Sequence, residues 1–133
     1  AHRVLIDAPC SCMGIIRRHP ELKWRLEEKN IDSLAKIQYQ LLEVAASHVV
    51  PGGVVVYSVC TFEPNETINL IKKFIKNNSE FELSPFPAHV VEWFKKAGVD
   101  TETIESGYQT FFPYTCGMDG FFIARLVKNG SGK

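Results

Sequence analysis

The sequence predicts an α/β fold in which parallel strands alternate with helices. The stretch Val54–Thr61 is expected to be a strand, and it begins with three consecutive β-branched valines. It has no sustained polar alternation, which is typical of a strand buried on both faces of a parallel sheet. A second apolar strand is expected at Arg3–Asp7, with a long amphipathic helix between the two. This order forms a βαβ unit, whose strands are parallel and whose crossover is right-handed.

Each helix is predicted from its apolar spacing and its terminal residues. The first is expected to begin at Ser33 with Asp32 as its cap. Its predicted apolar face consists of Leu34, Ile37, Leu41, Val44, Ala45 and His48. A second helix is expected from Pro64 to about Asn77, with Glu63 and Glu66 near the positive end of its dipole. The residues predicted to be buried on it are Ile68, Ile71, Phe74 and Ile75.

The remaining residues are expected to complete one domain. The predicted segments are a strand at 81–86, a helix at 88–97 ended by Gly98, a loop at 99–107, and an antiparallel pair of strands at 108–113 and 120–127. A chain of 133 residues with 45% hydrophobic residues has the size of one domain with one core. We assign residues 1–127 to that domain and residues 128–133 to a flexible tail.

Composition narrows the classes of partner and compartment. Fifteen basic residues balance fifteen acidic ones, so a nucleic acid would have to be held by a local patch. The sequence has neither an apolar run of transmembrane length nor a signal-peptide pattern, which predicts a cytoplasmic protein. The four cysteines form no Cys-x-x-Cys pair, so we expect no metal site and no disulfide framework. The sequence does not indicate an oligomeric state.

Three reactive side chains are expected to meet at one edge of the sheet. Asp7 and Cys10 follow the first strand, and Cys60 follows the second. Because the carboxyl ends of adjacent parallel strands lie about 4.8 Å apart, these groups should converge where α/β proteins bind ligands.

A basic segment follows the first strand. It contains Arg17, Arg18, His19, Lys23 and Trp24, a mixture suited to phosphate contacts and base stacking. The alternative is the solvated start of a helix with the indole tucked into the core.

Four blocks of the sequence occur in a recognisable order: Asp7–Ser11, Ile16–Trp24, Pro51–Gly53 with Tyr57–Cys60, and Asp119–Ala124. In order and spacing they resemble the Sun/RsmB (Fmu) family of RNA cytosine-5 methyltransferases. The chain departs from that family's pattern at Cys12 and Met13, where glycine and threonine are usual, and at Val59, where threonine is usual.

The resemblance implies the C-terminal half of a Rossmann-like class I methyltransferase fold, with S-adenosylmethionine as cofactor. The family's glycine-rich cofactor loop belongs to the other half, so the chain alone is expected to be inactive. The resemblance further implies that Cys60 is the nucleophile, that Cys10 assists product release, and that Asp7 lies against the cofactor and the target base. The basic block would contact RNA, with ribosomal RNA favoured over transfer RNA.

Two other functions remain open from the residues. A noncatalytic RNA-binding or scaffold module would fit a chain without the cofactor loop. A thiol-disulfide protein would use the rim cysteines, although Cys10-Ser11-Cys12 is too closely spaced for a Cys-x-x-Cys device.

Overall fold

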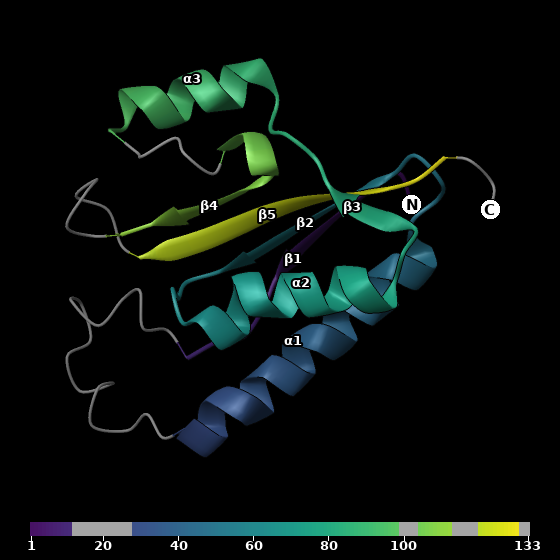
Figure 1. Cartoon of the computed structure of the whole chain (residues 1–133), viewed down its shortest axis with the longest axis vertical. Coiled ribbons are helices and arrows are strands. Elements are labelled where there is room, and N and C mark those ends of the chain that lie inside the picture. Colours follow the sequence, from purple (N-terminus) through teal and green to yellow (C-terminus); the bar gives the residue numbers. More distant parts are fainter. Residues whose placement is uncertain (12–27, 99–103, 113–119, 131–133) are drawn as a thin grey trace.

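A mixed sheet with helices on both faces forms the described part of the chain (Figure 1). The computed structural model describes residues 1–11, 28–98, 104–112 and 120–130. The elements in chain order are β1 (Arg3–Asp7), α1 (Glu28–His48), β2 (Val54–Val59), η3 (Pro64–Glu66), α2 (Ile68–Asn77), β3 (Phe81–Leu83), α3 (Ala88–Lys96), η4 (Ile104–Ser106), β4 (Tyr108–Phe111) and β5 (Phe121–Lys128). In these residues no helix is long and apolar enough to cross a membrane.

The predicted βαβ unit is confirmed. β1 lies parallel to β2 in a register that runs from Arg3 opposite Val54 to Asp7 opposite Ser58. β5 lies antiparallel on the other side of β2, and the five-stranded sheet has the order β1-β2-β5-β3. The expected antiparallel pairing of the last two strands is also present, because β4 pairs with β5.

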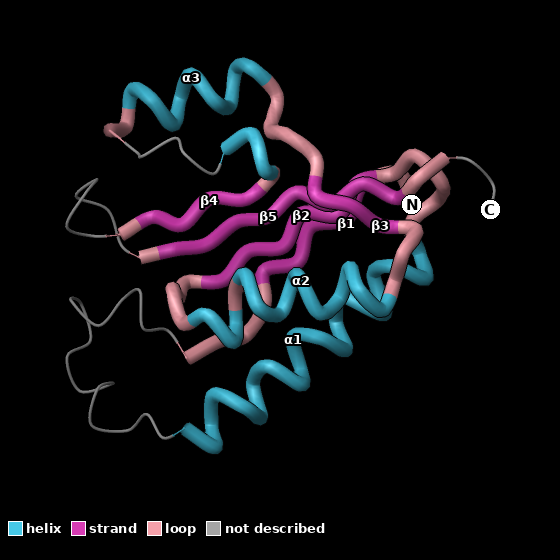
Figure 2. The backbone as a smooth tube through the Cα atoms, in the orientation of Figure 1, coloured by secondary structure: helices cyan, strands magenta, loops and turns pink. Residues whose placement is uncertain are grey.

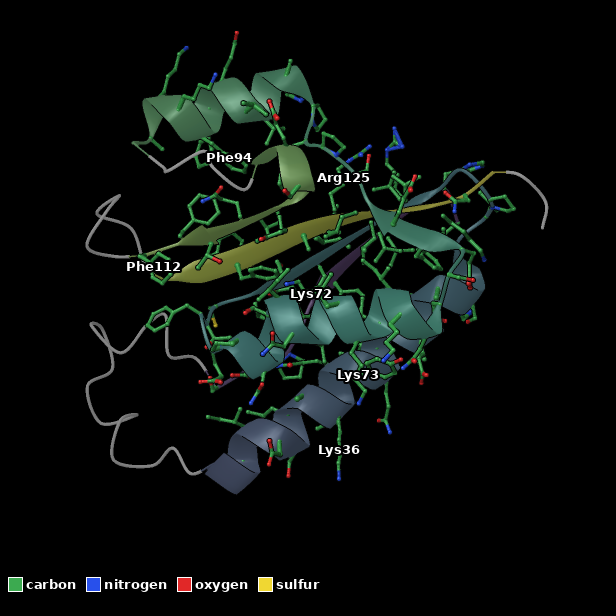
Figure 3. All side chains as sticks on the ribbon, in the orientation of Figure 1. Lys36, Lys72, Lys73, Phe94, Phe112 and Arg125 are labelled. Carbon is green, nitrogen blue, oxygen red and sulfur yellow. The ribbon has the colours of Figure 1, made fainter. Side chains whose placement is uncertain are left out.

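The outer edge of β5 is shared by two short strands placed end to end. β3 pairs with its C-terminal part and β4 with its N-terminal part. The two meet beside Arg125, whose carbonyl accepts from the Ser84 N–H and whose N–H donates to the Gly107 carbonyl. The Arg125 guanidinium also donates to Ser84 Oγ at 2.6 Å, which fixes the junction (Figure 3).

The two faces of the sheet carry separate apolar clusters. α1 and α2 cover one face and α3 covers part of the other (Figure 2). The largest fully buried side chains under α1 and α2 include Tyr57, Ile71, Phe74, Phe122 and Leu126. Under α3 the cluster is Phe86, Phe94 and Phe111. Burial of β2 on both faces was predicted. Val55, Tyr57 and Val59 on one face are fully buried, whereas on the other face Ser58 is buried and Val54 and Val56 are half-buried.

The predicted start of α1 is wrong, and of its predicted apolar face only Ala45 is fully buried. The helix already includes residues 28–32, so Asp32 lies within it and is not its cap. Ile37, Leu41 and Val44 are exposed, and the buried positions are Gln38, Leu42, Ala45 and Ala46. The helix is apolar around more than one face, and small alanines allow close packing on the sheet.

Other boundaries also differ from the prediction. The helix expected from Pro64 is divided at Thr67 into η3 and α2. The predicted loop at 99–107 contains η4, although residues 99–103 lie outside the described part. β5 extends to Lys128, which we assigned to the tail. Its ammonium group donates to the carbonyls of Ala46 and Val49 at 3.1 and 3.0 Å and so ties the strand to the end of α1.

Gly107 provides a test of the junction between β3 and β4. It has φ +88°, and an added Cβ would lie 2.7 Å from the Ser84 carbonyl oxygen. Gly107→Ala should therefore lower the free energy of unfolding by roughly 3 kcal/mol, through backbone strain and displacement of Ser84. Urea unfolding of the chain measures the loss.

Gly98→Ala is the matched control. Gly98 has a similar φ of +77°, but an added Cβ would meet nothing within 4 Å. It should cost only roughly 1 kcal/mol, the strain of a left-handed alanine. Equal losses for the two variants would show that the β3–β4 junction is not tightly packed.

Candidate active site

The carboxyl ends of β1 and β2 form the rim that the sequence predicted. The ladder continues past β1, because the Ala8 N–H donates to the Ser58 carbonyl at 3.1 Å. Two residues later the Cys10 Sγ lies 3.1 Å from the Cys60 Sγ, and both residues are partly buried. The expected convergence of the two thiols is therefore confirmed, while their chemical roles stay a prediction.

Asp7 occupies the same rim in a different environment. It is the last residue of β1, lies opposite Ser58 and is exposed. An exposed carboxylate at this rim can accept hydrogen bonds from a ligand or attract a positive charge. The remaining predicted site residues, Arg17, Arg18, His19 and Lys23, lie outside the described residues, as does Cys12.

The sequence did not predict a buried carboxylate that is bonded to the residue after Cys10. Glu66 has no exposed surface and accepts hydrogen bonds from the Ser11 N–H at 2.8 Å and the Ser11 hydroxyl at 2.6 Å. The Gln38 amide donates to the same carboxylate at 3.0 Å. These donors come from the loop after β1 and from α1, so one side chain ties both to η3.

Thr61 extends this network to the loop after β2. Its hydroxyl lies 3.1 Å from the Ser11 hydroxyl and accepts from the Glu63 N–H at 3.2 Å. Since the Ser11 proton is given to Glu66, the Thr61 hydroxyl donates to Ser11. The residue after Cys10 and the residue after Cys60 are thus joined directly.

Gln38 is held by the same contacts. Its Nε2 donates both to Glu66 and to the Pro9 carbonyl, the latter at 2.8 Å. Both partners are acceptors, so the amide nitrogen must point toward the rim. Its Oε1 is buried and has no hydrogen-bond partner among the described residues. Burial of this polar residue explains why apolar spacing gave the wrong face for α1.

Tyr57 connects the network to the core of the sheet. Its hydroxyl donates to the Glu66 carbonyl at 2.7 Å, and its ring is fully buried against Phe122. Burial raises the pKa of the Tyr57 hydroxyl far above its ordinary value, and the negative charges of Glu66 and Cys10 add to the effect. The hydroxyl therefore stays protonated and keeps its role as a donor.

An aromatic pair lies close to the same loop. The rings of Phe62 and Phe112 have centroids 5.6 Å apart, and both residues are half-buried (Figure 3). Phe62 follows Cys60 by two residues, and Phe112 follows the end of β4. The pair brings the loop after β2 to the end of β4.

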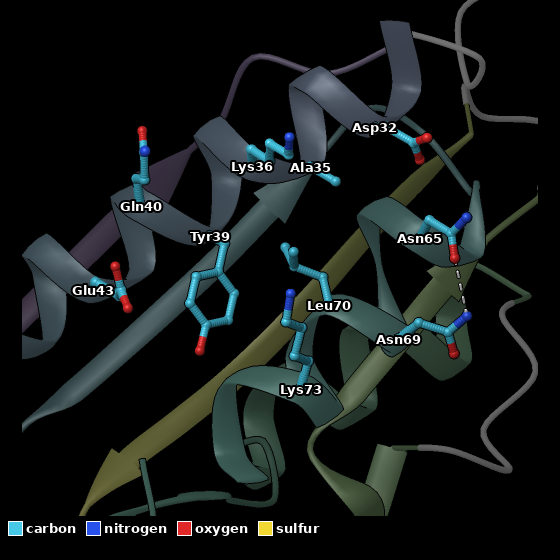
Figure 4. Close-up of a pocket in the computed structure, with 10 residues that line it drawn as sticks. All are labelled: Asp32, Ala35, Lys36, Tyr39, Gln40, Glu43, Asn65, Asn69, Leu70 and Lys73. Carbon is cyan, nitrogen blue, oxygen red and sulfur yellow. Dashed lines mark hydrogen bonds between the residues drawn. The ribbon is translucent and has the colours of Figure 1, made fainter. Parts of the chain in front are cut away.

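A separate groove of about 610 Å³ runs between α1 and α2 (Figure 4). Lys73 extends over the Tyr39 ring there, with its ammonium group 5.1 Å from the ring centroid. Asp32 and Glu43 offset Lys36 and Lys73, and no cysteine lines the groove. Its mixed charge indicates no particular ligand. The described residues contain no group of three or more His, Cys, Asp or Glu side chains that could hold a metal ion.

Comparison with known proteins assigns the chain to a family. The sequence model described as "16S rRNA methyltransferase RsmB/F" matches residues 1–127. The chain belongs to the RsmB/F methyltransferase family. Its fold is accordingly the C-terminal part of a Rossmann-like methyltransferase domain, as the sequence predicted.

Individual relatives agree with this RsmB/F assignment. The chain is 37% identical over 126 residues to ribosomal RNA small subunit methyltransferase B of Pasteurella multocida, covering 95% of this chain and 26% of the relative. It is 38% identical to the probable enzyme of the same name from Synechocystis, covering 95% and 27%. The chain therefore spans about a quarter of the length of these curated relatives.

A solved structure shares both the fold and the sequence pattern. The crystal structure of NSun6 from Pyrococcus horikoshii with SFG superposes with a TM-score of 0.71 at 29% identity. The match covers 93% of this RsmB/F chain and 29% of that protein. SFG is an analogue of S-adenosylmethionine.

Glu66 was missed because its neighbours predict a simpler role. Pro64-Asn65-Glu66 has the composition of a helix start, where an acidic residue is explained by the dipole. No sequence signal distinguishes this carboxylate from that of half-buried Glu63, because its donors among the described residues, Ser11 and Gln38, are distant in the sequence.

The thiol contact makes an oxidation test possible. Diamide removes two electrons and two protons from a pair of thiols, and the Cys10 and Cys60 sulfurs at 3.1 Å need little movement to bond. We expect rapid formation of a Cys10–Cys60 disulfide, detected by mass spectrometry of unreduced peptides and reversed by dithiothreitol. Cross-linked peptides that instead join Cys12 to either thiol would contradict the observed pairing.

Proposed function

We propose that this RsmB/F chain is the thiol-bearing part of an enzyme that methylates carbon 5 of cytosine in RNA, using S-adenosylmethionine. The observation that carries the proposal is the pair of thiols, Cys10 and Cys60, in contact at the carboxyl ends of two parallel strands. The names of the relatives favour ribosomal RNA as the substrate. The cytoplasm is the proposed place of action.

Methylation at this carbon explains a need for a nucleophilic thiol. Carbon 5 of cytosine is a poor nucleophile, and addition of the Cys60 thiolate to carbon 6 moves the ring electrons toward carbon 5. S-adenosylmethionine, when bound, supplies the methyl group. A proton then leaves carbon 5, the bond between Cys60 and carbon 6 breaks, and the ring double bond re-forms. We assign assistance in this release to Cys10, because its sulfur touches that of Cys60.

Two other groups of residues are given roles in binding. The exposed Asp7 carboxylate fits a cofactor that carries amino groups and a positive sulfonium. Arg17, Arg18, His19 and Lys23 are proposed to contact RNA phosphates. The target base has to leave its stack to reach the rim, which is easier in unpaired RNA.

A thiol-disulfide function is the second candidate, since the same 3.1 Å contact would allow Cys10 and Cys60 to cycle between thiols and a disulfide. It gives no role to the basic block or to Asp7. The two functions differ in the effect of dithiothreitol, because a methyltransferase needs both thiols reduced and turns over in its presence. A noncatalytic RNA-binding module would need neither thiol.

Substitution of each cysteine in the full-length enzyme separates their roles. Cys60→Ala cannot bond to carbon 6, so it should give neither methylated RNA nor a covalent complex. Cys10→Ala should still attack and should accumulate enzyme bonded to its RNA, seen as a slow band on a denaturing gel. Methyl transfer from labelled cofactor measures turnover in the same samples.

Cys12→Ala is the control for these two variants, because the mechanism gives that thiol no task. It should change neither the slow band nor turnover. A slow band from Cys60→Ala, or normal turnover by Cys10→Ala, would contradict the assigned roles.

The 133-residue chain alone should bind S-adenosylmethionine weakly. It contains no glycine-rich loop of the kind that holds this cofactor, and Asp7 supplies only one contact. Calorimetry should therefore show no binding in the micromolar range. A micromolar or tighter dissociation constant would mean that the rim described here forms most of the cofactor site.

A further inference from the structure

We propose that Glu66 is a positioning residue, whose buried carboxylate holds Cys10 against Cys60. Its carboxylate accepts hydrogen bonds from Ser11, the residue after Cys10, and from Gln38 on α1. Its proposed effect on methyl transfer rests on the proposed function. Its effect on the thiol geometry does not.

The connection to Cys10 runs through the adjacent residue. Both the N–H and the hydroxyl of Ser11 donate to the Glu66 carboxylate, at 2.8 and 2.6 Å. Two bonds from one residue to the two oxygens of one carboxylate fix the orientation of the peptide between Cys10 and Ser11. The loop after β1 is thereby held at a set distance from η3.

The connection to Cys60 uses the other loop. Thr61 bonds to the Ser11 hydroxyl, and Tyr57 on β2 donates to the carbonyl of Glu66 itself. Glu66 is thus anchored to β2 through its backbone and to the Cys10 loop through its side chain. Gln38 completes the set by donating to Glu66 and to the Pro9 carbonyl.

Packing alone does not account for a carboxylate at this position. A fully buried acidic side chain is costly unless its oxygens accept hydrogen bonds, and an apolar side chain would fill the space with less desolvation. Among the described residues, the donors to this carboxylate are Ser11, which belongs to the Cys10 loop, and Gln38, which also bonds to the Pro9 carbonyl in that loop. The network therefore serves the relative placement of the two thiols.

Glu66→Gln in the full-length enzyme is the test. The amide has the same shape but carries no charge, so the Ser11 and Gln38 N–H bonds to its oxygen weaken. Its NH₂ group takes the place of the oxygen that accepts from the Ser11 hydroxyl, which can no longer donate there, so the loop is held less tightly. We expect kcat for RNA methylation to fall by roughly 100-fold, as for a reacting group misplaced by about 1 Å. The KM for RNA should stay unchanged, because the basic block is untouched.

Diamide closure of the Cys10–Cys60 disulfide is a second readout that needs neither RNA nor cofactor. We expect Glu66→Gln to slow closure by at least about tenfold, because a disulfide tolerates little misplacement. Loss of a nearby negative charge would favour the thiolate and speed closure. A slower reaction therefore reports geometry and not charge.

Glu63→Gln is the matched control. Among the described residues this half-buried carboxylate accepts one long bond, from the Asn65 N–H at 3.4 Å. It should behave as wild type in both assays. Melting curves identify folded variants, and Ser11→Ala, which keeps the backbone N–H bond, replaces Glu66→Gln if the latter does not fold.

Wild-type closure rates in a folded Glu66→Gln or Ser11→Ala enzyme would overturn the proposal. If the wild-type enzyme transfers no methyl group to RNA, the proposed function fails and the closure rates still decide the role of Glu66.

Discussion

β1 and β2 lie side by side over their whole length, with Asp7 opposite Ser58 at the last paired position. Parallel pairing forces both strands to end at the same edge, so residues 50 positions apart in the chain meet there. The helices and the antiparallel strands surround this pair. β5 covers the second edge of β2, and α1 and α2 bury the face that carries Tyr57.

Strand pairing brings the two loops near each other, and hydrogen bonds set their final distance. A parallel ladder ends with the Ala8 N–H, two residues before Cys10. Beyond that point the contacts of Ser11 with Glu66 and Thr61 connect the two loops. Such bonds are stronger when an ionisable oxygen accepts them in a dry environment. The rim is therefore defined by strand pairing up to Ala8 and by the hydrogen bonds of Ser11 beyond it.

The parts of this architecture that depend on local pattern were predictable. The β-branched run at Val54–Val59 and the apolar Arg3–Asp7 segment specify strands, and one helix between them requires parallel pairing. The approach of Cys10 to Cys60 follows from that topology. The buried face of α1 was not predictable, because Ile37, Leu41 and Val44 form as good a stripe as the true one. Gln38 and Glu66 were missed for the same reason, since their burial depends on partners distant in the sequence.

The outer edge of β1 has a consequence for what the described sheet can pair with. In the described sheet β1 pairs only with β2, and Leu5 on it is 71% exposed. An apolar edge strand with unpaired backbone groups is a template for adding strands from other molecules. Ile37, Leu41 and Val44 of α1 are further apolar side chains that are exposed in the described structure. The outer edge of β1 can therefore accept a further strand without disturbing the rim, whose contacts lie beyond the carboxyl end of that strand.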